Sequence, residues 1–192
     1  MNAGWRKAAA AGLVLALCAA ASAAGQDKTV PKSLVRFAED TLVKLGQDAQ
    51  LVAFVEKDNA RPVAIDRLKA LDKQWQAKDN IEDFVKALLA SPVSARLASL
   101  IAADKFLPEA FIMNAQGTII GETNRTSTYW KGEQAKFTGA FNGGKGAVWY
   151  GTLAFDESTK INAVQVSVPV SKGGAAIGAI CFTVNVDEWE KR

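Results

Sequence analysis

The densest group of residues able to bind a small molecule lies between positions 125 and 131, in the run Arg-Thr-Ser-Thr-Tyr-Trp-Lys. Aromatic walls with a few convergent hydrogen-bond donors are typical of small-molecule pockets. Arg125 or Lys131 would hold a carboxylate, which an arginine binds through two parallel hydrogen bonds. Thr128, Tyr129 and Trp130 are the neighbouring candidates, because binding residues gather on loops. In the alternative interpretation, the two aromatic residues pack the loop onto a sheet and both cations are solvated.

Trp149 is the sixth candidate for the ligand-binding site. Trp149 and Tyr150 are consecutive residues of an expected strand, so their side chains point to opposite faces. One of the two side chains should therefore face inward. That side chain would either line the pocket or, in the alternative interpretation, pack in the core.

The residue types needed for catalysis are missing or isolated. The sequence has no histidine, which removes serine–histidine triads and the commonest zinc sites. Cys181 lies in an apolar run and is expected to be a buried small hydrophobe. Asp104, Glu109 and Glu122 show no spacing that would pair two carboxylates for acid–base chemistry. We therefore expect no enzyme, with no catalytic residues, metal or cofactor.

The first 23 residues have the pattern of a secretory signal peptide. The basic pair Arg6-Lys7 precedes an apolar run of about 14 residues, short of the roughly 20 that a membrane-spanning helix needs. Residues 21–23, Ala-Ser-Ala, fit the small-x-small cleavage pattern, although neighbouring cleavage positions stay open. Cys18 follows a bulky leucine, which disfavours a lipid anchor there. The pattern predicts a mature protein in the periplasm.

The expected mature chain carries almost no net charge. Without Arg6 and Lys7 it has 21 of the 23 basic residues, against 20 acidic ones. A field that would attract nucleic acid is therefore absent. The remaining length suits one domain with its own core. By pattern, this domain divides into a helical segment, residues 24–104, and a strand-rich region, residues 105–192.

Helical periodicity fills the first segment. Apolar residues recur every three or four positions from Pro31 or Lys32 to Asp58, which predicts a helix of about 27 residues and about 40 Å. Gly46 interrupts this helix at a cost of about 1 kcal/mol relative to alanine. Such a helix exceeds what one small sheet covers, so its N-terminal half would project or pair with a second copy. A second helix is expected over residues 64–77. A third should begin at Asp79 or Asn80 with a capping box, and a fourth should begin at Pro92 with Ser91 as its N-cap.

From Glu109 the hydrophobic period changes from helical spacing to two. Gly117 closes a hairpin turn at a position that requires a positive φ. The pattern predicts an α+β fold, with the long N-terminal helix and further helices packed on a five-stranded antiparallel sheet. The strands are expected at 110–113, 118–123, 147–155, 162–171 and 175–186, with a short helix over 131–141.

The strand-rich region opens with Phe111-Ile112-Met113, an Asn-x-x-Gly turn and a second strand, and the loop 126–133 follows. The segments 166–170 and 177–186 come later and are joined by a short turn. Together these segments resemble the PAS-like extracytoplasmic sensor domains of the Cache or PDC superfamily, over about residues 105 to 187. The resemblance implies a small-molecule pocket between the sheet and the loops and helix that follow the second strand. Some relatives place a carboxylate that holds a ligand amine at the position of Asp156, although turn chemistry explains this residue better.

The resemblance implies sensing rather than catalysis. Most such domains are joined to membrane helices and to a kinase or chemoreceptor, whereas this sequence shows no second membrane segment and no output domain. We expect a stand-alone module that binds a small carboxylate or amino acid and signals to a membrane-bound sensor kinase or chemoreceptor. The alternative is an interaction protein that forms a homodimer, or docks, through its long helix without a small ligand. Coverage of the apolar stripe of residues 31–58 by the domain itself would argue against that alternative.

Overall fold

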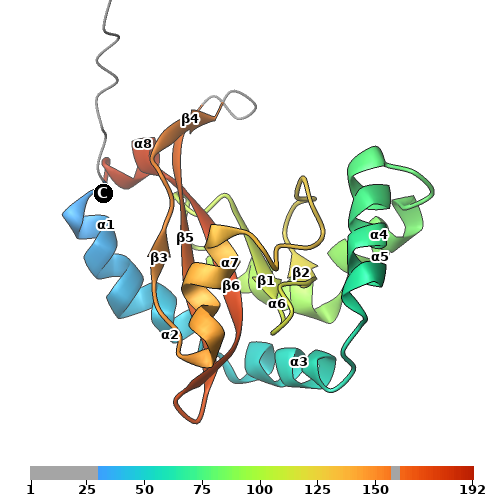
Figure 1. Ribbon diagram of the computed structural model, residues 1–192. Coiled ribbons are helices and arrows are strands. Elements are labelled where there is room, and N and C mark those ends of the chain that lie inside the picture. Colours follow the sequence, from blue (N-terminus) through green and yellow to red (C-terminus); the bar gives the residue numbers. More distant parts are fainter. Residues whose placement is uncertain (1–29, 157–160) are drawn as a thin grey trace, which may run out of the picture.

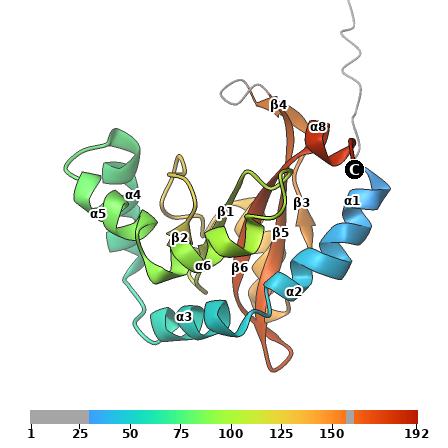
Figure 2. The same ribbon diagram turned by 180° about the vertical axis from the view of Figure 1, so that it is seen from behind.

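A computed structural model describes residues 30–156 and 161–192. The signal peptide expected over residues 1–23, and Cys18 within it, lie outside the described residues. A twisted antiparallel sheet forms the centre of the molecule, with helices on both of its faces (Figure 1). Seen from behind, α2, α3 and α6 cross one face of the sheet (Figure 2), and α7 lies on the other face (Figure 1).

The segment predicted as one long helix forms in two parts. The first part comprises α1 (Lys32–Phe37), a π-helical stretch (Ala38–Leu42) and α2 (Val43–Leu45), and the second is α3 (Ala49–Asn59). The chain turns at Gly46 because the sheet passes too close for a side chain. A Cβ atom there would lie 2.1 Å from the carbonyl oxygen of Pro169. Asp48 then starts α3 by accepting hydrogen bonds from the backbone N–H groups of Gln50 and Leu51.

Most of the apolar stripe of these helices is covered by the domain itself, although Ala49 is exposed. Its five central side chains are fully buried in the core: Leu34, Ala38, Leu42, Leu51 and Val55. A helix whose apolar face is already buried has no hydrophobic motive to pair with a second copy. The structure therefore gives no support to self-association through this stripe.

Three further helices lead to the sheet: α4 (Ile65–Ala77), α5 (Glu82–Leu89) and α6 (Pro92–Ile101). Ser91 caps α6 by accepting a hydrogen bond from the N–H of Ser94, as predicted. The expected capping box at Asp79 does not form. Its place is taken by a tight reversal in which Lys78 and Asn80 have positive φ angles of 55° and 49°, so α5 begins only after Ile81.

The sheet confirms the predicted α+β class and its antiparallel strands. The strand order is β2-β1-β6-β5-β3, and β4 pairs with the far end of β5. The edge strand expected over 147–155 forms as two short strands, because the chain leaves the ladder after Gly151, which still donates a hydrogen bond to Gln165. Gly117 has the predicted positive φ, 74°. The strands are β1 (Glu109–Met113), β2 (Ile119–Glu122), β3 (Trp149–Tyr150), β4 (Ala154–Asp156), β5 (Ile161–Lys172) and β6 (Ala175–Asn185).

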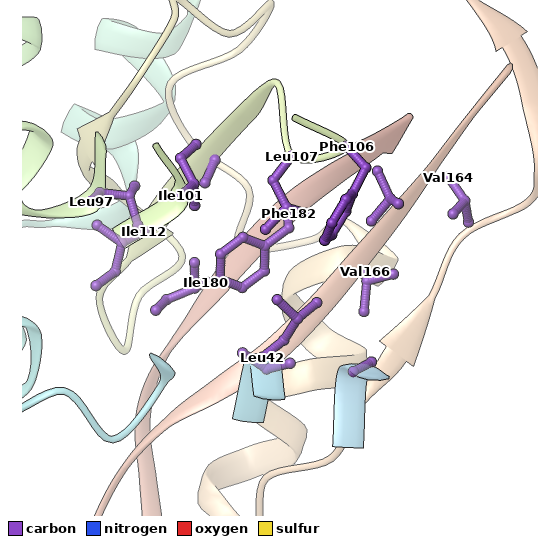
Figure 3. Close-up of a cluster of buried hydrophobic side chains, with 14 of the residues drawn as sticks. Leu42, Leu97, Ile101, Phe106, Leu107, Ile112, Val164, Val166, Ile180 and Phe182 are labelled. Atoms are coloured by element: carbon purple, nitrogen blue, oxygen red, sulfur yellow. The ribbon is translucent and has the colours of Figure 1, made fainter. Parts of the chain in front are cut away.

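The two faces of the sheet differ in chemistry. On one face, the alternate valines of β5 from Val164 to Val170 pack with Ile180 and Phe182 of β6 against the helices (Figure 3). On the other face, α7 (Ala135–Phe141) covers a second cluster that includes Phe111 and Cys181. Cys181 is fully buried, as predicted. A short final helix, α8 (Val186–Trp189), was not predicted and closes the end of the first cluster.

No single helix within the described ranges has both the length and the apolar character to span a bilayer. The α5–α6 pair meets that test only when both helices are counted together, and the two are bent by 53°.

Candidate ligand-binding site

The wall of the site is a long connection between β2 and α7, residues 123–134, which we call the cavity loop. It returns alongside β2, where Ile119 donates a backbone hydrogen bond to Tyr129 and Lys131 donates one to Gly117. This return passes very close to the first hairpin turn, since a Cβ atom on Gly117 would lie 2.5 Å from the Cα of Gly132. The first hairpin therefore fixes the second half of the loop.

A cavity of about 320 Å³ lies between the cavity loop, α7 and the face of the sheet that is not covered by the valine-rich core. Its volume lies at the lower end of the range typical of small-molecule sites. β1, β5 and β6 supply its floor, and the first half of the loop supplies one side. It is lined by Pro108, Glu109, Phe111, Asn124, Arg125, Thr126, Ser127, Lys131, Lys136, Ile161, Gln165 and Thr183.

A second cavity of about 270 Å³ adjoins the first along the sheet. The two share Glu109, Gln165 and Thr183, so these residues stand between them. Trp149 provides an aromatic wall of the second cavity and packs closely against Gly139 of α7. The two cavities together offer one extended slot with a floor of strand residues.

Lys131 is the most unusual lining residue, because its side chain is buried, with the whole residue only 2 % exposed. Its Nζ atom donates a hydrogen bond to Oγ1 of Thr128 and lies 5.3 Å from the centre of the Phe111 ring. Burial, with Lys136 as a second positive charge nearby, lowers the pKa of Lys131 to about 8. No carboxylate of the described chain forms an ion pair with it.

Two carboxylates lie near the cavity in different surroundings. Glu109 lines both cavities and accepts a hydrogen bond of 2.7 Å from the hydroxyl of Thr183. Glu122 is fully buried at the base of the cavity loop, where its Oε2 accepts a hydrogen bond from the N–H of Thr126. Its Oε1 has no hydrogen-bond partner in the part of the chain that is described. Burial therefore raises the pKa of Glu122.

Three of the six candidate residues line this slot. Arg125 and Lys131 line the first cavity, and Trp149 lines the second. The guanidinium of Arg125 is also held from behind, because it donates to the carbonyl of Trp75 at 2.8 Å and lies 3.3 Å from a carboxylate oxygen of Glu82.

The other three candidates support the loop instead of lining the slot. Tyr129 is buried, and its ring lies 5.4 Å from that of Trp75, centre to centre. Trp130 donates from its indole nitrogen to the carbonyl of Gln116. Thr128 accepts a hydrogen bond from Lys131. Their positions agree with the alternative in which the aromatic residues anchor the loop, although they anchor it to α4 and to the hairpin turn rather than to the sheet.

Glu109, Lys136, Gln165 and Thr183 are among the slot residues that sequence reasoning did not select. Gln165 had a signal, because it alternates with the buried valines of β5 and so must face the other side of the sheet. Glu109 and Thr183 become neighbours only through the pairing of β1 with β6. Metal binding finds no support, since no cluster of three His, Cys, Asp or Glu side chains occurs in residues 30–156 and 161–192.

No protein family and no curated protein matches the chain. Among solved structures, the sensor domain of the Vibrio cholerae histidine kinase DctB aligns with a TM-score of 0.39 and 15% identity, over 74% of this chain and 60% of that one. The ligand-binding domain of the Campylobacter jejuni chemoreceptor Tlp3, in complex with 4-methylisoleucine, gives 0.40 and 10%, over 81% and 65%. That of the Pseudomonas aeruginosa amino acid chemoreceptor PctC, in complex with GABA, gives 0.39 and 14%, over 80% and 62%. The chain thus spans less than two thirds of each of these domains. All three are sensory or ligand-binding domains.

Proposed function

We propose that this protein is an exported, non-enzymatic sensory module that binds a small anionic ligand in the slot between the sheet and the cavity loop. The observation that carries the proposal is the buried, cavity-lining Lys131 without a carboxylate partner among the described residues. A buried ammonium group is costly unless it is paired. An anionic ligand group would supply the missing charge.

The two ends of the slot suggest a ligand with both charges. Lys131 and Lys136 gather positive charge at the end walled by the loop. Glu109, which stands between the two cavities, offers a carboxylate, and Trp149 in the second cavity offers an aromatic face. A carboxylate and an aromatic face are groups that hold an ammonium ion. A small amino acid fits this pattern, with its carboxylate toward Lys131 and its amine toward Glu109.

Export and signalling are proposed from the sequence pattern and the resemblance. The N-terminal pattern favours secretion to the periplasm, and we propose that the module passes its signal to a separate membrane-bound kinase or chemoreceptor. We favour this proposal over the interaction-protein alternative, because most of the apolar stripe of α1 to α3 is buried within the domain.

A thermal-shift screen of residues 24–192 tests this proposal. The panel holds amino acids, their amides, the matching acids without the amine, and polyamines. A ligand at one hundred times its dissociation constant stabilises the folded state by about 2.7 kcal/mol. We expect shifts with amino acids, weaker shifts with the amides, and loss of the shift in Lys131→Met but not in Lys145→Met, an exposed control.

Two results would count against the proposal. One is a shift that survives unchanged in Lys131→Met, since the anion would then bind elsewhere. The other is the absence of any shift across the panel. Glu109→Gln separately tests the amine end: it should reduce the shift by amino acids more than the shift by acids that lack an amine.

A further inference from the structure

The helix α4 stands away from the sheet, beyond β2, and forms an arm with α5 (Figures 1 and 2). The polar side-chain contacts of α4 with the rest of the described chain are all made with the cavity loop. Every side-chain hydrogen bond and ion pair that joins α4 to another part of the described chain ends on the cavity loop. The polar contacts of α4 with the rest of the described chain are therefore made with the wall of the ligand slot.

Asp72 makes the central connection. Its Oδ1 accepts hydrogen bonds from two consecutive backbone N–H groups of the loop, those of Tyr129 at 2.6 Å and Trp130 at 3.1 Å. Its Oδ2 is held by the side-chain amide of Gln76, one turn along the same helix. Hydrogen bonds to an ionised acceptor are among the stronger ones in proteins, so Asp72 fixes the stretch of loop immediately before Lys131.

Trp75, on the next turn of α4, fixes the earlier part of the loop. Its indole nitrogen donates to the carbonyl of Thr126 at 2.7 Å. In return Arg125 donates to the carbonyl of Trp75 and stacks on the indole ring, 5.0 Å from its centre. One helix therefore holds the loop at two places, at Arg125-Thr126 and at Tyr129-Trp130.

We propose that α4 is the element that reports occupancy of the slot, with Asp72 as the residue that positions the cavity loop for binding. The role of the ligand rests on the proposed function, whereas the mechanical coupling of loop and helix does not. A change that stabilises the cavity loop in its present conformation must also stabilise α4, because the same hydrogen bonds join the loop to the helix. Pairing of Lys131 with an anion would be such a change, as it removes the cost of a buried charge next to the loop.

Hydrogen exchange measured by mass spectrometry on residues 24–192 without ligand tests the coupling. Asp72→Ala should speed exchange at least about tenfold in the loop peptide that contains the amides of Tyr129 and Trp130, since both lose their acceptor. Asp72→Asn keeps an acceptor oxygen and should restore most of the protection. Asp66→Ala is the matched control, because Asp66 is an exposed carboxylate on the first turn of the same helix.

Lys131→Met probes the coupling from the cavity side without touching α4. Removal of the buried charge should slow exchange in the loop and in residues 65–77 by a similar factor, and leave α6 unchanged. A change confined to the loop, or a normal loop in Asp72→Ala, would overturn the proposal. If Asp72→Ala fails to fold, the exchange rates of Asp72→Asn and Lys131→Met still test the coupling between the loop and α4. Because no ligand is present, failure here is distinct from a failed ligand screen.

Discussion

Replacement of Lys131 by methionine should change how stability depends on pH. The folded-state pKa of Lys131 is about 8, against an ordinary value of 10.5. Between these two values the unfolded chain holds a proton that the folded chain has released, so the free energy of unfolding rises with pH. One pKa unit corresponds to about 1.4 kcal/mol, so burial of the charged form costs about 3 kcal/mol at neutral pH.

The assay is urea unfolding of wild type and Lys131→Met at pH 7, 8, 9 and 9.5. Methionine fills a similar volume and does not titrate, so the difference between the two proteins isolates the lysine. We expect wild type to gain about 2 kcal/mol relative to Lys131→Met from pH 7 to 9.5. Lys145→Met, at an exposed position, should show no such slope. A difference that stays constant over this range would refute the assignment of Lys131 as a buried charge.

The same residue gives ligand binding a pH dependence under the proposed function. An anionic ligand pairs only with the charged lysine, so its affinity should fall as the pH rises above about 8. Isothermal titration calorimetry at pH 7 and 9 would measure this loss with any ligand found in the screen.

Three further changes test other parts of the structure. Gly46→Ala should lower the free energy of unfolding by about 1–3 kcal/mol, since its Cβ would collide with the carbonyl of Pro169; a wild-type urea midpoint would contradict the close approach. In wild type the free energy of unfolding should fall as the pH rises above 4.5, because the buried carboxyl of Glu122 has a raised pKa and keeps its proton to a higher pH than in the unfolded chain. Glu122→Gln should remove this fall, and thermal unfolding from pH 4 to 7 would measure it in both proteins. Asp48→Ala should cost about 1–2 kcal/mol at pH 7, as it removes both a helix cap and the ion pair with Arg96, whose hydrogen bond lowers the pKa of Asp48. That cost should shrink as the pH falls through the lowered pKa, and an unchanged cost at pH 2 would contradict the ionic part.

Local rules were sufficient for those elements whose cause lies within a few residues. The alternating valines of β5 and the Ser91-Pro92 helix start both appear in the structure as predicted. The turn glycine Gly117 does too, because each of these depends on neighbours in sequence. The break at Gly46 depends instead on the backbone of Pro169, which only the folded sheet brings near.

The site was harder to predict because a loop has no periodicity to tell which side chains face inward. The sequence singled out the run 125–131 but did not separate Lys131, which lines the cavity, from Tyr129, which packs against α4. Asp72 gave no signal at all. It lies 57 residues before Tyr129, and its role appears only when α4 is placed against the loop.

The alternation along β5 has a consequence for how proteins of this kind diverge. Val164 and Val166 build the core, whereas Ala163 and Gln165 line the slot on the opposite face of the same strand. Substitutions at the first pair are constrained by folding, and those at the second pair only by what is bound. Two copies of such a gene can therefore diverge in ligand preference through changes at Ala163 and Gln165 without loss of the valine core.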